Sequence, residues 1–204
     1  NLTAIAHNLN EYKKLLAPGT KVMAMVKAFS YGSGTFEIAS VLQFQNVDYL
    51  AVAYADEGIA LRKAGISIPI MIMNVDENSF AALVEHNLQP VIYSMELLHK
   101  FEIYLQSQAL MNYPVHLEIE TGMHRLGFDQ GDMENLKEHL RKTELLKIES
   151  VFSHLAASEA PLEDAFTLAQ VNLFKTAADS LQSVLPYAFI RHIANSAAII
   201  RHPY

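Results

Sequence analysis

The sequence predicts an α/β fold, namely a TIM-type (β/α)8 barrel that is incomplete in this segment, with about seven βα units. Strands and helices alternate along the chain, and the strands are near-continuous apolar runs, as expected for parallel strands buried on both faces. No Gly-x-Gly-x-x-Gly follows the first strand, which disfavours a dinucleotide-binding open sheet. Seven units in 204 residues fit a barrel lacking its last unit, because a complete barrel takes roughly 250 residues.

The elements follow one another in a regular order. Apolar positions from Leu2 to Leu16 have helical spacing, Pro18-Gly19 ends that helix, and residues 22–26 form a buried strand. Further helices are expected at 36–46, 55–64, 78–86, 95–107, 132–142 and 162–184. Further strands are expected at 49–52, 68–73, 89–93, 114–119, 146–152 and 189–193.

The chain is expected to form a single domain, residues 1–204. It starts without a methionine, enters a helical pattern at once and stops just after a helix-like stretch. We therefore expect that both ends are truncated relative to the natural polypeptide, and that a final βα unit is missing.

Composition and charge exclude several classes of function. Hydrophobic residues make up 51% of the chain and charged residues 18%, which suits a large globular core. The net charge of −7 and the lack of a basic block argue against a nucleic-acid partner, and no apolar run is long enough for a membrane partner. Cysteine is absent, which removes disulfides and thiolate chemistry and fits a cytoplasmic protein. The nine histidines lack ligand spacing, so no metal is expected.

Lys27 carries the clearest chemical pattern. It closes the first apolar strand, where an apolar wall would desolvate its amine and lower its pKa, as a lysine that condenses with a carbonyl requires. The following Tyr31-Gly32-Ser33-Gly34 would let backbone N–H groups approach a phosphate. The alternative is a lysine that reaches into solvent beside an ordinary loop.

Other polar residues also gather at predicted strand ends, where the active sites of (β/α)8 barrels lie. They are Glu118, Glu120, Thr121, His124 and Arg125 after the fifth strand, Ser153 and His154 after the sixth, and His192, Asn195 and Ser196 after the seventh. Arg125 could bind a phenolate or carboxylate, and His154 could stack on a flat heteroaromatic ring. Asn195 or Ser196 could cap a helix whose first N–H groups bind an anion. A solvated arginine, a core histidine and simple capping are the respective alternatives.

Four segments resemble the alanine racemase family, in the same order. Residues 24–34, AMVKAFSYGSG, are similar to the family's pyridoxal 5'-phosphate (PLP) lysine motif, and residues 121–128, TGMHRLGF, to its arginine loop. Residues 152–156, FSHLA, and 195–198, NSAA, match two further blocks. The resemblance spans essentially the whole chain. It implies the N-terminal PLP-binding barrel domain of that family, with a β-rich C-terminal domain, missing from this segment, that follows in the full protein.

The resemblance implies a role for each site residue. Lys27 would form the internal aldimine with PLP and act as one of two acid/base groups, and Arg125 would bind the phenolic oxygen of PLP. Tyr31 and Ser196 would bind the phosphate with the helix start at Asn195, and His154 would lie by the pyridine ring. The second acid/base group would come from the C-terminal domain of the partner subunit in a homodimer.

The implied function is PLP-dependent racemisation of L-alanine and D-alanine, an isomerase activity that supplies D-alanine for the bacterial cell wall. The segment alone would be inactive. Alternatives are a racemase of other amino acids, the racemase domain of a fused cell-wall ligase, a non-catalytic PLP-binding module, and a barrel for another phosphate ligand.

Two positions depart from the family pattern. Ser33 stands where the family usually has histidine. Glu118 stands where many members carry a carbamylated lysine that braces the arginine. We expect that Glu118 pairs with Arg125 and replaces the carbamate.

Overall fold

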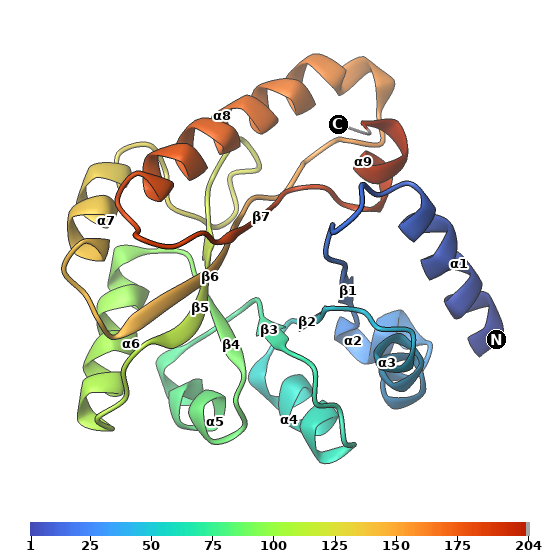
Figure 1. Cartoon of the computed structure of the whole chain (residues 1–204), viewed down its shortest axis with the longest axis horizontal. Helices are drawn as coiled ribbons and strands as arrows, with labels where there is room; N and C mark the ends of the chain where they lie inside the picture. The colour runs from blue at the N-terminus through green and yellow to red at the C-terminus, as the bar shows by residue number, and fades with distance from the viewer. Residues whose placement is uncertain (203–204) are drawn as a thin grey trace. The chain divides into compact units, whose positions relative to one another are not determined.

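The computed structural model describes residues 1–202. The chain divides into two compact units, the first from Asn1 to Val91 and the second from Ile92 onward. In each unit parallel strands alternate with helices along the chain (Figure 1).

The first unit contains ten elements. They are α1 (Leu2–Lys14), β1 (Met23–Met25), α2 (Lys27–Gly32), α3 (Thr35–Phe44), β2 (Tyr49–Val52), α4 (Ala55–Lys63), β3 (Ile70–Ile72), the short 3-10 helix η1 (Glu77–Ser79), α5 (Phe80–Glu85) and β4 (Gln89–Ile92), which ends at the boundary. The strands pair in parallel in chain order, and β2 and β3 are buried along their whole lengths. The helices α4 and α3 pack next to one another, and α4 packs on β2 and β3.

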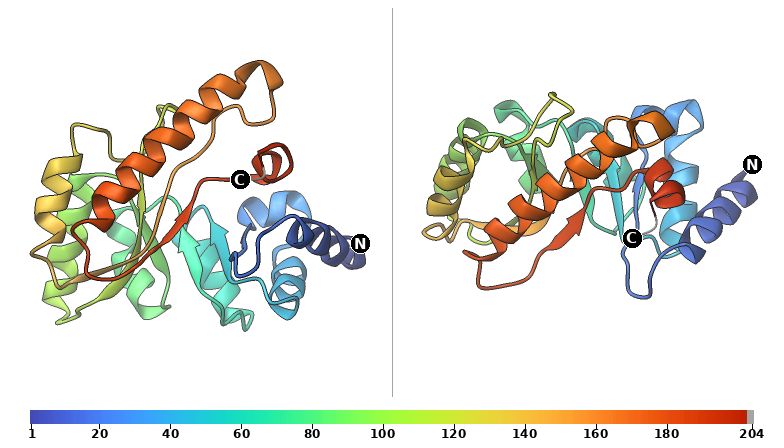
Figure 2. Two further views of the ribbon diagram at one scale, coloured as in Figure 1. Left: turned by 45° about the horizontal axis from the view of Figure 1, so that its top comes forward. Right: turned by 90° about the horizontal axis from the view of Figure 1, so that it is seen from above.

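The second unit contains eight elements within its described residues, 92–202. They are α6 (Met95–Ser107), β5 (Tyr113–Glu118), α7 (Met133–Leu140), β6 (Leu146–Phe152), η2 (Pro161–Glu163), α8 (Asp164–Gln182), β7 (Ile190–His192) and α9 (Ser196–Arg201). The strands β5, β6 and β7 are parallel, with a register shift between Val115 and His116. Figure 2 shows α8 alongside β7, and an ion pair between Asp179 and Arg191 joins the two elements.

The predicted elements are present, with differences at their ends. The first strand is shorter than predicted, since it spans Met23–Met25, and two predicted helices begin with a turn of 3-10 helix. The element α2, which starts at Lys27, was not predicted. Among residues 1–202, no helix is both long enough and apolar enough to cross a bilayer.

Candidate functional site

Lys27 lies two residues beyond β1, with the buried Val26 between them. The backbone that follows Lys27 is unusual, because Ala28, Phe29, Ser30 and Tyr31 have φ values of 51°, 56°, 50° and 55°. All four residues are therefore in the left-handed helical region, which costs roughly 1–2 kcal/mol for each residue that has a side chain. We call residues 28–31 the left-handed turn. Such strain is maintained only where surrounding contacts enforce it.

Backbone and side-chain contacts hold the left-handed turn. The Ser30 N–H donates to the Val26 carbonyl (3.2 Å), and the Gly34 N–H donates to the Phe29 carbonyl (3.1 Å). A carboxylate from α4 adds a third contact, since Glu57 Oε1 accepts from the Ala28 N–H at 2.6 Å. The turn therefore has a fixed connection to α4 directly beside Lys27.

Glu57 also holds the start of its own helix. Its Oε2 accepts from the Ala53 N–H at 2.7 Å and from the Tyr54 N–H at 3.1 Å. One carboxylate thus binds three backbone N–H groups from two segments of the first unit. The role of Glu57 was not predicted from the sequence.

The side chains of the left-handed turn differ in their surroundings. Lys27 is half-buried and Tyr31 is 66% exposed, so the phenol is accessible. The hydroxyl of Ser30 is buried and makes no hydrogen bond within the described residues. A polar atom in that state costs free energy unless a ligand or solvent reaches it, which marks this turn as a candidate binding segment.

In the second unit, Arg125 lies on a closed loop. The Glu120 N–H donates to the Phe128 carbonyl, and the Phe128 N–H donates to the Glu118 carbonyl, both at 2.9 Å. Gly127 has a φ of +123°, and a Cβ on it would lie 2.6 Å from the Glu120 nitrogen. Only glycine fits there without moving the backbone, so the loop closure depends on this residue.

The expected direct pairing of Glu118 with Arg125 is wrong for this structure. Glu118 is buried and Arg125 is exposed, and no ion pair or hydrogen bond joins them within the described chain. Burial raises the pKa of the Glu118 carboxyl, the positive charge of Arg125 lowers this pKa, and the charge of Glu120 raises it. The guanidinium of Arg125 therefore acts on Glu118 through its charge, without a hydrogen bond or ion pair between the two side chains in the described chain.

His154 follows β6 and is half-buried. The residue before it, Ser153, is buried and its Oγ lies 2.7 Å from Oγ1 of Thr121, which begins the loop of Arg125. The segments that carry Arg125 and His154 are therefore joined by a hydroxyl pair. Gln170 of α8 adds further bonds to both segments and was also missed from the sequence.

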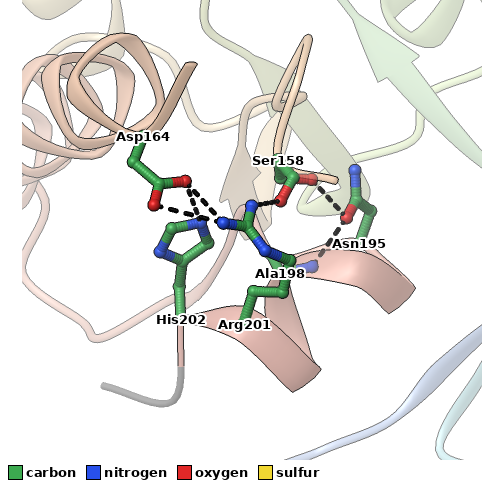
Figure 3. Close-up of polar contacts among 6 residues, drawn as sticks. All are labelled: Ser158, Asp164, Asn195, Ala198, Arg201 and His202. Atoms are coloured by element: carbon green, nitrogen blue, oxygen red, sulfur yellow. Dashed lines mark hydrogen bonds and ion pairs between the residues drawn. The ribbon is translucent and has the colours of Figure 1, made fainter. Parts of the chain in front are cut away.

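The predicted helix start at residues 195–198 is present. Asn195 Oδ1 accepts from the Ala198 N–H (3.0 Å), which makes Asn195 the cap of α9, and also from Ser158 Oγ (2.8 Å; Figure 3). Arg201 donates to both oxygens of Asp164 (2.9 and 3.1 Å) and to the Ser158 carbonyl (2.6 Å). Ser196 is exposed at the first position of α9, on a segment held by these contacts.

Ser150 of β6 contacts a histidine on each neighbouring strand, one on β5 and one on β7. Ser150 Oγ lies 2.7 Å from His116 Nδ1 and 3.1 Å from His192 Nε2, and the His192 ring stacks on Phe152. Burial lowers the pKa of His116 to about 3 and that of His192 to about 4. Both rings are therefore neutral near pH 7.

Parallel strands that alternate with helices, and polar residues on the loops that follow the strands, define a domain of the (β/α)8-barrel class. The chain belongs to the alanine racemase family, because the family described as "Alanine racemase, N-terminal domain" matches residues 1–204.

Named relatives and solved structures agree with this membership. The alanine racemases of Methanococcus maripaludis and Carboxydothermus hydrogenoformans are 32% and 36% identical to the chain, over 100% of it and 54% of each relative. The alanine racemase structure from Clostridium difficile 630 superimposes with a TM-score of 0.90 at 33% identity, over 98% of this chain and 52% of that one. The chain thus spans about half the length of these relatives, and the predicted fold class of an incomplete barrel is confirmed.

The six predicted site residues are divided between the units. Lys27 and Tyr31 belong to the first unit, and Arg125, His154, Asn195 and Ser196 belong to the second. Each of the six lies in the stretch of chain that follows a strand.

Proposed function

We propose that the full-length protein racemises alanine with PLP as its cofactor. The observation that carries this proposal is the position of Lys27, two residues beyond β1 and directly before a strained left-handed turn. Membership of the alanine racemase family supports the same reaction.

The residues present fit PLP in their chemistry. Lys27 offers an amine for the aldehyde, and Arg125 offers a guanidinium for the phenolic oxygen. The hydroxyls of Tyr31 and Ser196 are donors for a phosphate, and the His154 ring can lie against a pyridine. The buried Ser30 hydroxyl, which has no hydrogen-bond partner in the described chain, favours a polar ligand near the left-handed turn.

Bound PLP would supply an electron sink that acidifies the Cα proton of an amino acid. The Lys27 amine would hold the aldehyde and then move a proton at Cα from one face. Arg125 would keep the phenolic oxygen oriented through a charge-assisted hydrogen bond. Asn195 would maintain the start of α9, so that Ser196 and the neighbouring N–H groups hold the phosphate.

Racemisation needs a second acid/base group on the other face of Cα. We assign this group to a residue outside this chain, in the C-terminal domain of the partner subunit of a homodimer. Accordingly, residues 1–204 alone should not racemise alanine. We further propose that the protein works in the cytoplasm and supplies D-alanine for the cell wall.

Exchange and product formation test the proposal. Full-length protein loaded with PLP should exchange the Cα proton of alanine for deuterium and convert L-alanine to D-alanine. Lys27→Ala should abolish both reactions, whereas Lys21→Ala, which removes an exposed lysine of the same unit, should leave them unchanged. PLP binding without exchange would show a non-catalytic PLP module, and exchange only with other amino acids would replace alanine as substrate.

A further inference from the structure

We infer that Gln170 is a positioning residue that fixes the loop carrying Arg125 against the segment carrying His154. This inference rests on the proposed function, because both of those residues are assigned to PLP. Gln170 lies on α8 and is completely buried.

The amide of Gln170 binds both segments at once. Its Nε2 donates to Thr121 Oγ1 at 3.3 Å and to the His154 carbonyl at 3.1 Å, and its Oε1 accepts from the Ala156 N–H at 3.0 Å. Both donor hydrogens and the acceptor of the amide are therefore used, and the bonds go to two separate loops.

The place of Gln170 on α8 indicates that these bonds are specific. It lies one turn before the buried Phe174, on the face that packs into the unit together with Ala178 and Leu181. A buried amide costs free energy unless its hydrogen bonds are satisfied. An apolar residue would serve packing alone, so the amide here serves the polar contacts.

The same helix contacts the Arg125 loop at a second point. A Cβ on Gly122 would lie 2.9 Å from the ring of Phe166, one turn before Gln170, and 3.5 Å from Gln170 Cγ. The backbone of Gly122 thus packs closely on α8. The start of the Arg125 loop is held by packing at Gly122 and by hydrogen bonding at Thr121.

The Thr121–Ser153 hydroxyl pair also links the two segments directly. A single pair of hydroxyls can act as a pivot, since it leaves rotation about the contact free. Gln170 adds bonds on both sides of that pivot, at Thr121 and at the backbone of His154 and Ala156. Together these bonds fix the orientation of one segment relative to the other, which a cofactor bound by both Arg125 and His154 requires.

The test uses the full-length protein with Gln170→Met, which keeps the length of the side chain and removes all three bonds. The control is Gln182→Met on the same helix, where the amide donates to the carbonyls of Leu185 and Tyr187 and touches neither loop. Amide hydrogen exchange, the PLP dissociation constant and the visible absorption band of bound PLP are measured for each variant.

We expect Gln170→Met to raise the exchange rate at Ala156 and to weaken PLP binding by about tenfold, which equals about 1.4 kcal/mol. Its PLP band should also shift, whereas Gln182→Met should lose similar stability but keep the wild-type affinity and band. If Gln170→Met is too unstable, Gln170→Glu keeps the acceptor for Ala156 and should weaken PLP binding through the lost donors.

An unchanged PLP affinity and band in a folded Gln170→Met protein would overturn the inference and leave Gln170 a packing residue. If the wild-type protein takes up no PLP, the proposed function fails. Amide hydrogen exchange at Ala156 and in the Arg125 loop then still tests the positioning role. An exchange rate in Gln170→Met equal to that of the wild type would refute that role.

Discussion

Replacement of Glu57 by glutamine tests how the left-handed turn beside Lys27 is maintained. The carboxylate accepts from the N–H groups of Ala28, Ala53 and Tyr54 through two oxygens. A glutamine amide has one acceptor oxygen and places an NH2 group at the other position. At least one of the three backbone N–H groups must then face a donor.

The expected loss of folding stability in Glu57→Gln follows from these hydrogen bonds. A hydrogen bond to a charged group contributes roughly 1.5–3 kcal/mol, and partial exposure of Glu57 places the loss at the lower end, at about 2 kcal/mol. Four residues in the left-handed region oppose the native turn by roughly 4–8 kcal/mol. Removal of a 2 kcal/mol contact should therefore let the turn relax, which displaces Lys27 and Tyr31 and weakens PLP binding.

Urea denaturation and PLP titration of the full-length protein measure both effects. The matched control is Asp76→Asn, which alters another capping carboxylate of the first unit, one that accepts from the Asn78 N–H at 2.8 Å and is far along the chain from Lys27. We expect Glu57→Gln to lose more stability than Asp76→Asn and to lose PLP affinity, whereas Asp76→Asn keeps the affinity. Equal stability losses together with unchanged PLP affinity would refute the reasoning.

Two further predictions concern the second unit. Gly127→Ala should lower the free energy of unfolding by about 3 kcal/mol or more, because it combines a positive φ with a backbone clash at Glu120. The control Gly65→Ala, at a position with a positive φ and open space, should lower it by only about 1 kcal/mol. Equal losses in urea denaturation would contradict this account. The free energy of unfolding should fall as the pH drops below about 6.5, since His116 and His192 take up protons in the unfolded chain but stay neutral in the folded protein. Each histidine should contribute a slope of up to roughly 1.4 kcal/mol per pH unit. His192→Gln should flatten this slope between pH 6.5 and 4, and an unchanged slope would exclude His192 as a cause.

The fold was largely predictable from sequence because parallel strands are buried on both faces. Segments such as Leu50-Ala51-Val52 are therefore apolar at every position, and Figure 1 shows the helices that follow from the intervening amphipathic patterns. The positions of Lys27, His154 and Asn195 after strands followed from the same alternation.

The left-handed turn was not predictable from local sequence. Ala28, Phe29 and Tyr31 have no preference for positive φ, so the conformation is imposed by contacts from other segments, including Glu57 on α4. In the sequence, Glu57 resembles an ordinary acidic residue in the first turn of a helix.

The way in which Arg125 interacts with Glu118 also could not be predicted from the sequence pattern. The spacing places Glu118 and Arg125 on adjacent segments, but the bridge between Ile119 and Phe128, which closes the loop that carries Arg125, was not predicted. Gln170, by contrast, left a detectable pattern, since it is a polar residue at helical spacing from the apolar Phe174, Ala178 and Leu181.

The central claim is that the Lys27 amine holds the cofactor, and chemical trapping tests it most directly. Full-length protein is incubated with PLP, reduced with borohydride, digested and analysed by mass spectrometry. We predict that the stable pyridoxyl label is found on Lys27 and that alanine added before reduction decreases this labelling. A label on another lysine such as Lys21, or no label in a protein that racemises alanine, would contradict the account.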